Sequence, residues 1–184
     1  MTKVTIKKSR ISRKKKVTEV YTDGSAADNG KACARAGYGV FFGDGDPRNL
    51  SEPFFSYPLT NNRAELYACI RAIEQYMLYS KLRTKQSKLI INSDSKYVID
   101  SMTKWLEGWK KKGWKTAGKK PVKNMDMIYW LDKLLALHCD VVEFEFRHVS
   151  AHGKKEEPED RRYGNDMADQ FAVEGTEKSR QADC

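Results

Sequence analysis

The chain has 184 residues, of which 40% are hydrophobic and 11% aromatic, and it carries a formal net charge of +9. This length is typical of one domain with one sizeable core, and the basic balance favours a polyanionic partner such as nucleic acid. No stretch approaches the ~18 apolar residues of a membrane-spanning helix, and the N-terminus lacks the apolar centre of a secretion signal. We therefore expect no membrane association.

The cysteines are scattered and form no CxxC pair. They are Cys33, Cys69, Cys139 and Cys184. Three histidines cannot complete a convincing zinc site with them, so free thiols in a reducing, intracellular compartment are expected rather than a disulfide framework.

The positive charge is concentrated in two segments. Residues 1–16 hold eight Lys or Arg and no acid, and residues 104–123 hold eight Lys and one acid, Glu107. We expect residues 1–16 to be a disordered tail that serves as a nuclear address or a phosphate-binding arm, with a solubilising tail as an equally good reading. The nucleus is thus the suggested compartment, and the cytoplasm and the mitochondrion are alternatives.

The first elements in chain order are three predicted strands at 17–21, 36–42 and 50–57. Asp23 follows the first strand, and Gly24 and Ser25 indicate a turn directly after it. Pro53 indicates that the third strand is an edge strand or contains a bulge. Because short turns join these strands, they are expected to form an antiparallel meander.

A helix is predicted from Asn62, with apolar residues at three- and four-residue steps as far as Met77. Asn62 is a good N-cap and Glu65 can close a capping box. A carboxylate in this first turn also suits the helix dipole, so Glu65 has a structural explanation as well as a functional one.

The next predicted strand, 88–92, is continuously apolar and suits a central position in the sheet. Asp94 follows it and precedes another predicted helix, which contains Tyr97 and Trp105. Ligands of open α/β sheets gather beyond the carboxyl ends of strands, where both Asp23 and Asp94 are expected. The structural alternative is that each Asp caps the element that follows it.

Three Trp residues lie four to five positions apart among lysines in the segment 105–115, WLEGWKKKGWK. A core segment rarely carries three consecutive lysines, so a nucleic-acid-binding surface is favoured over plain core packing.

The last third of the chain predicts a helix at 125–137 and a half-buried, parallel or edge strand at 141–149. His152 follows that strand, and 154–162 is expected to be a charged loop. A final helix is predicted from about Asn165, with Asp166 and Asp169 in its first turns, and residues from 179 onward are expected to fray.

The motifs TDGS, TNNRAEL, NSDSKYV, GWKKKGWKT and HVSAHG…GNDMAD occur in an order that strongly resembles type 1 ribonuclease H, in particular the eukaryotic form, over residues 17–178. The resemblance implies an α/β ribonuclease H-like fold, with a mixed five-stranded sheet of three antiparallel strands and then parallel strands, flanked by helices. It also implies endonucleolytic cleavage of the RNA strand of RNA–DNA hybrids, with little sequence specificity and with 5′-phosphate and 3′-hydroxyl ends. A monomer without an organic cofactor is expected.

Residue by residue, the resemblance implies that two Mg²⁺ ions, with Mn²⁺ as an alternative, are held by four carboxylates: Asp23, Glu65, Asp94 and Asp169. It assigns the active-site histidine to His152 and the asparagine beside the centre to Asn165. Contacts to the RNA strand are implied for Asn29, Asn61 and Asn62. Thr60 and Asn124 match a pocket for a DNA-strand phosphate. A DNA-binding channel and a basic protrusion are implied for Trp105, Trp109, Lys110, Lys111, Lys112, Trp114 and Lys115.

The sequence departs from the family pattern at three places. Pro58 stands where some members have an Arg in the phosphate pocket, which predicts a weaker pocket. The loop between His152 and Asn165 is longer and more charged than usual. We expect the basic tail to stand in place of the separate N-terminal hybrid-binding domain of many eukaryotic members.

Two other function classes remain open at this point. One is a non-catalytic nucleic-acid-binding module on the same fold, against which the presence of all four acids argues. The other is a different two-metal nuclease, such as an exonuclease or a Holliday-junction resolvase, which would lack the GWKKKGWK segment. A purely structural interaction protein explains neither feature.

Overall fold

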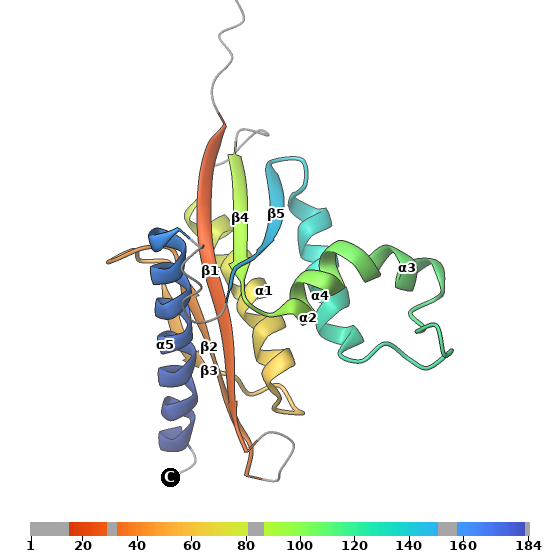
Figure 1. The fold of residues 1–184 in the computed structure, drawn as a ribbon, viewed down its shortest axis with the longest axis horizontal. Coiled ribbons are helices and arrows are strands. Elements are labelled where there is room, and N and C mark those ends of the chain that lie inside the picture. Colours follow the sequence, from red (N-terminus) through yellow and green to blue (C-terminus); the bar gives the residue numbers. More distant parts are fainter. Residues whose placement is uncertain (1–14, 29–32, 81–86, 151–157, 183–184) are drawn as a thin grey trace, which may run out of the picture.

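The computed structural model describes residues 15–28, 33–80, 87–150 and 158–182, and it places a five-stranded sheet between helices (Figure 1). The strands are β1 (Lys16–Ala27), β2 (Arg35–Phe41), β3 (Leu50–Pro53), β4 (Ser87–Ser93) and β5 (Val142–His148). The helices are α1 (Asn61–Tyr79), α2 (Lys96–Asp100), the π-helical turn η1 (Ser101–Trp105), α3 (Leu106–Lys111), α4 (Met125–His138) and α5 (Glu159–Ala182). Most of the basic tail, Asn29 and His152 lie outside the described residues.

The strands follow the order β3-β2-β1-β4-β5. β1, β2 and β3 pair in antiparallel fashion, whereas β1, β4 and β5 are parallel. This order confirms the expected mixed sheet and the antiparallel meander. It also confirms that β3, which contains Pro53, is an edge strand and that β4 is an interior one.

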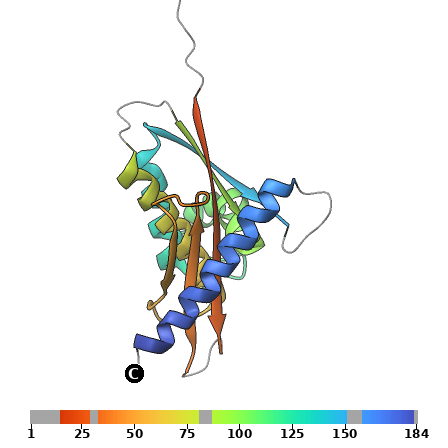
Figure 2. The same cartoon turned by 90° about the vertical axis from the view of Figure 1, so that its left-hand side faces the viewer.

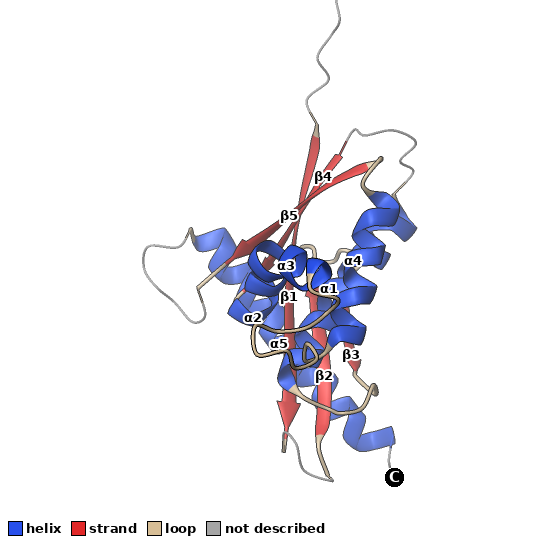
Figure 3. Cartoon of the chain, turned by 90° about the vertical axis from the view of Figure 1, so that its right-hand side faces the viewer, coloured by secondary structure: helices blue, strands red, loops and turns tan. Residues whose placement is uncertain are grey.

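Helices cover both faces of the sheet. α5 crosses the face formed by β1, β2 and β3 (Figure 2), and α1 and α4 lie against the opposite face (Figure 3). α5 comes very close to β2 because Gly39 has no side chain: a Cβ there would lie 2.0 Å from the backbone oxygen of Ala168. This close contact fixes the height of α5 above the sheet.

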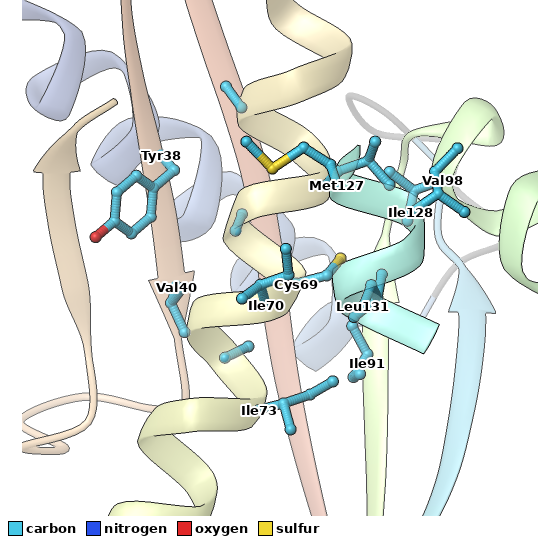
Figure 4. Packing of buried hydrophobic residues seen from close by; sticks show 14 of the residues in the cluster. Tyr38, Val40, Cys69, Ile70, Ile73, Ile91, Val98, Met127, Ile128 and Leu131 are labelled. Carbon is cyan, nitrogen blue, oxygen red and sulfur yellow. The ribbon is translucent and has the colours of Figure 1, made fainter. Parts of the chain in front are cut away.

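The main core lies between the sheet and the α1/α4 layer (Figure 4). The apolar stripe predicted for α1 supplies Cys69, Ile70 and Ile73, which are completely buried. Ile91 of β4 and Leu131 of α4 pack against them. Each such side chain contributes about 1.5–3 kcal/mol through burial, so this layer holds α1 rigidly against the sheet.

The outward face of β5 is polar, as its alternating sequence predicts. Lys88 of β4 pairs with Glu143 at 3.2 Å and with Glu145 at 2.6 Å, and Arg147 pairs with Glu145 at 3.1 Å. The inward residues of β5 pack against the core.

Four predicted boundaries are wrong. β1 does not turn at Gly24 but continues to Ala27, because it stays paired with β2 after its pairing with β4 has ended. β3 ends at Pro53 rather than at residue 57. α5 begins at Glu159, so the end of the expected charged loop is helical, and it continues to Ala182 beyond the expected fraying point.

Candidate metal centre

Two acids of the candidate site are brought together by the register of the parallel strands. Tyr21 of β1 is the last residue that pairs with β4, and its partner is Asn92. Asp23 and Asp94 each lie two residues beyond this pair. Because side chains alternate along a strand and neighbouring strands are about 4.8 Å apart, the two carboxylates emerge side by side.

Glu65 reaches the same place from α1. A Cβ on Gly24 would lie 2.2 Å from the backbone nitrogen of Glu65, so the helix can approach β1 only because residue 24 is a glycine. The Gly24 N–H donates hydrogen bonds to the carboxylates of both Asp23 and Glu65. One glycine therefore permits the close contact and partly stabilises the two charges.

Asp23, Glu65 and Asp94 form a candidate metal centre, because they offer carboxylate oxygens that all lie within 4.8 Å of one another. Burial and the charges of Asp94 and Asp169 raise the pKa of Asp23 to about 7. Burial and the charges of Asp23 and Asp94 raise the pKa of Glu65 well above its usual range. Like charges held together away from water are costly unless a cation neutralises them.

Asp169 and two amides complete the surroundings. Asp169 of α5 lies near enough to Asp23 to raise its pKa, but it is not one of the three acids whose oxygens converge within 4.8 Å. Asn61 donates to Glu65 Oε1 at 3.4 Å, and Asn165 donates to Asp94 Oδ2 at 3.4 Å. The other oxygen of Glu65 is buried and has no partner among the described residues. A set of carboxylate oxygens with an unused buried acceptor fits a hard divalent cation.

The structural explanations for Glu65 and Asp94 are both wrong. Thr60, not Asn62, is the N-cap of α1, and its side chain makes no capping hydrogen bond, so the capping box does not form. At α2 the N-cap is Ser95, whose side chain accepts a hydrogen bond from the Val98 N–H. Both acids are therefore free to face the cluster.

The Trp- and Lys-rich segment, residues 105–115, lies partly on the surface and packs partly against the core. Trp105 is 40% exposed and lies 5.5 Å from Trp109 between ring centroids, whereas Trp109 and Trp114 pack partly against the core. Lys110 is paired with Asp132 at 3.1 Å and with Glu107 at 3.4 Å. Lys111, Lys112 and Lys115 are exposed, and Figure 1 shows that α3 and the loop after it project from the sheet.

The remaining predicted residues lie at the N-termini of α1 and α4. Thr60 and Asn62 belong to the start of α1, and Asn124 is the N-cap of α4. Arg63 of α1 donates to both carboxylate oxygens of Asp126 of α4, at 2.8 and 2.7 Å, and so joins the two helix ends. No sequence signal predicts this pair, since its two residues are 63 positions apart in the chain. Tyr97 is likewise predicted only as part of a helix.

In the part of the chain that the structure describes, no helix is both long and apolar enough to span a membrane.

Comparison with known proteins gives a consistent result. The model of the family described as RNase H matches residues 15–177. A ribonuclease H of Schizosaccharomyces pombe is 44% identical over 156 residues, which are 85% of this chain and 52% of that protein. The human ribonuclease H1 is 36% identical over 161 residues, or 87% of this chain and 50% of that protein. The chain thus spans about half the length of these curated relatives.

A solved structure also shares the fold. The crystal structure of LC11-RNase H1 in complex with an RNA/DNA hybrid superposes with a TM-score of 0.56 at 24% identity, and the match covers 88% of this chain and 97% of that one.

Proposed function

The chain belongs to the ribonuclease H family, and from this membership we propose that it is an endonuclease that hydrolyses the RNA strand of RNA–DNA hybrids. The observation that carries the proposal is the cluster of Asp23, Glu65 and Asp94, whose oxygens lie within 4.8 Å of one another. The relatives named ribonuclease H and the structural neighbour solved with a hybrid support the choice of substrate.

The catalytic metal is proposed to be a pair of Mg²⁺ ions, with Mn²⁺ as an alternative, held by Asp23, Glu65, Asp94 and Asp169. Such ions neutralise the scissile phosphate, activate a water molecule and stabilise the leaving oxygen. The protein's own contribution is to keep the carboxylates of Asp23, Glu65 and Asp94 converged, with Asp169 of α5 near Asp23. Asn61 orients Glu65 and Asn165 orients Asp94 through their amide hydrogen bonds.

His152 is proposed as the active-site histidine, and Asn29 as a contact to the RNA strand. Both lie outside the described residues, so their assignment rests on the sequence motifs alone.

Substrate selection is proposed to depend on shape. Asn61 and Asn62, at the start of α1 beside Glu65, are suited to meet 2′-hydroxyl groups, which distinguish RNA from DNA without reading sequence. The DNA strand is proposed to follow the rings of Trp105 and Trp109 and the exposed lysines of 111–115. The products would carry 5′-phosphate and 3′-hydroxyl ends.

A phosphate of the DNA strand is proposed to bind between the starts of α1 and α4, at Thr60 and Asn124. Thr60 Oγ1 is buried and has no partner among the described residues. The start of α1, which Arg63 and Asp126 join to the start of α4, has first-turn N–H groups without a helical acceptor, and these favour an anion.

The test is cleavage of a labelled RNA strand annealed to DNA or to RNA, with Mg²⁺ or with a chelator. We expect internal cuts only in the hybrid and only with metal. An Asp94→Asn variant should abolish cleavage and keep hybrid binding, and Asp140→Asn, which changes an exposed acid after α4, is the matched control. Equal cleavage of duplex RNA would contradict the proposal, and binding without cleavage would favour a non-catalytic module.

A further inference from the structure

The hydroxyl of Tyr97 lies between two groups of the segment that leads into α4. It donates a hydrogen bond to the backbone oxygen of Lys123 at 3.0 Å and accepts one from Nδ2 of Asn124 at 3.1 Å. Tyr97 is the second residue of α2, and Asp94 of the metal cluster lies three residues before it. One short segment therefore connects an acid of the cluster with Asn124.

Asn124 has an unusual conformation. Its backbone is left-handed, with φ 57° and ψ 30°, and its side chain makes no capping hydrogen bond to α4 although it occupies the N-cap position. A left-handed conformation costs most residues about 1–2 kcal/mol, and Asn is among the few types that adopt it. The Asn124 amide therefore does not cap α4, which is the usual role of an Asn at this position. It is turned toward Tyr97 instead.

The hydrogen-bond pattern also determines which end of the amide faces Tyr97. The hydroxyl has one proton, which goes to the Lys123 oxygen, so the Tyr97 oxygen can only accept. A reversed amide would place its carbonyl oxygen against the hydroxyl oxygen and lose the bond. Nδ2 keeps a second N–H that Tyr97 does not use, and this donor remains available to an anion.

The neighbourhood of Asn124 is rigid. The guanidinium of Arg63, whose side chain is 5% exposed, holds Asp126 with two hydrogen bonds. The backbone oxygen of Asn124 accepts the Ile128 N–H at 3.1 Å, as expected for the first turn of α4. With the backbone fixed in this way, the remaining freedom of Asn124 is the rotation of its side chain, which is the freedom that the Tyr97 hydroxyl removes.

We propose that Tyr97 is a positioning residue for the DNA strand: its hydroxyl fixes the amide of Asn124 so that an N–H is presented to a phosphate at a set distance from the metal centre. This inference rests on the proposed function and goes beyond it, since the sequence motifs assign no role to the Tyr97 hydroxyl. Tyr97 acts through Asn124 and does not itself touch the reacting atoms.

The test is a Tyr97→Phe variant, which keeps the ring and removes only the hydroxyl. We expect KM for the hybrid to rise about 5-fold, which corresponds to the loss of one hydrogen bond, while kcat stays within about twofold. The control is Tyr79→Phe, because Tyr79 is 53% exposed and ends α1, at the opposite end of the helix from Thr60. Tyr79→Phe should leave both constants unchanged.

A second readout separates positioning from general destabilisation. A series of hybrids, each with one neutral methylphosphonate in the DNA strand, should reveal one position at which neutralisation weakens binding to the wild type. Tyr97→Phe and Asn124→Ala should both reduce this position-specific penalty, and the double variant should lose no more than Asn124→Ala alone. Additive losses, or an unchanged penalty in Tyr97→Phe, would overturn the proposal.

The binding arm is run by fluorescence anisotropy in the Asp94→Asn background. It therefore yields a result even if the wild type does not cleave hybrids, an outcome that would contradict the proposed function separately. A fall in kcat with unchanged KM would also count against positioning of the DNA strand.

Discussion

Arg63 and Asp126 join the first turns of α1 and α4 through two hydrogen bonds, at 2.8 and 2.7 Å. The pair is asymmetric, because the side chain of Arg63 is 5% exposed and that of Asp126 is 61% exposed. Loss of the acid therefore leaves a buried cation without its partner, whereas loss of the arginine leaves a largely solvated carboxylate.

We expect Asp126→Ala to lower the free energy of unfolding by about 2 kcal/mol, a value discounted for the exposure of the acid. Arg63 lowers the pKa of Asp126 below 3.8. The contribution of a carboxyl with a lowered folded-state pKa is present above the unfolded pKa and is lost as pH falls through the folded pKa. The difference between wild type and variant, measured by urea unfolding, should thus be full at pH 7 and shrink below about pH 4.

The matched control for this pair is Glu74→Ala, which breaks the Arg71–Glu74 pair of α1, in which the arginine is 26% exposed rather than 5%. A partly exposed i,i+3 pair of this kind contributes less than about 0.5 kcal/mol. Equal losses in the two variants would show that burial of Arg63 does not determine the effect.

Substitution of Asp23 should have opposite effects on activity and on stability. In Asp23→Asn we expect cleavage to be lost, because a metal ligand is removed, and the metal-free protein to become more stable at pH 8. Burial and neighbouring acids raise the folded-state pKa of Asp23 to about 7, against 3.8 for an unperturbed group. Stability that depends on such a group is complete below pH 3.8 and is lost as pH rises through about 7.

Thermal unfolding in a chelator should therefore show the variant stabilised by roughly 2 kcal/mol at pH 8 and by much less at pH 5, since one pKa unit corresponds to about 1.4 kcal/mol. Mg²⁺ should raise the melting temperature of the wild type more than that of the variant. Asp132→Asn, which removes the partner of Lys110, is the control and should not stabilise. If Asp23→Asn were less stable than the wild type at pH 8, the conclusion that the clustered acids destabilise the metal-free protein would be contradicted.

Both the packing of α1 against β1 and the geometry of the metal centre depend on the absence of a side chain at Gly24. Gly24→Ala would place a Cβ 2.2 Å from the Glu65 backbone nitrogen, which neither β1 nor α1 can avoid without moving. We expect a loss of about 3 kcal/mol in stability and the loss of cleavage, because the separation of Asp23 and Glu65 would change.

The control is Gly108→Ala in α3, where a Cβ would meet nothing within 4 Å. Alanine should stabilise this helix by about 0.5–1 kcal/mol. Urea unfolding and hybrid cleavage of the two variants separate the effect of the close contact from that of a glycine substitution in general. If Gly24→Ala were stable and active, the close approach of β1 to α1 at Gly24 could not be essential for the fold or for cleavage.

The sequence predicts the mixed sheet and the three converging acids Asp23, Glu65 and Asp94 well, because apolar periodicity and motif order are local signals. It fails where tertiary contacts decide. Gly24 suggests a turn, but pairing with β2 continues the strand through it. Asn62 and Glu65 suggest a capping box, but the helix begins at Asn61 with Thr60 as its N-cap, so Glu65 lies beyond the capping position and faces the cluster. The partners of Arg63 and Tyr97 are distant in sequence and give no local signal at all.

Adjacent lysines of α3 should differ in their effect on hybrid binding. Lys110 is held by Asp132 at 3.1 Å and by Glu107 at 3.4 Å, whereas Lys111 is exposed and has no acidic partner among the described residues. A lysine that contacts a phosphate releases about 0.9 counterion from B-form DNA, so its loss lowers the salt dependence of binding by about that amount. We expect Lys111→Gln to reduce the slope of log K against log salt by nearly one, and Lys110→Gln to reduce it by much less, because the charge of Lys110 is already partly neutralised.

Anisotropy titrations of a hybrid between 50 and 200 mM salt, a range in which such slopes are resolved, give both values. If the slope changed more in Lys110→Gln than in Lys111→Gln, the hybrid would have to displace Asp132 from Lys110. If the slope changed in neither variant, α3 would be excluded from the DNA-binding surface.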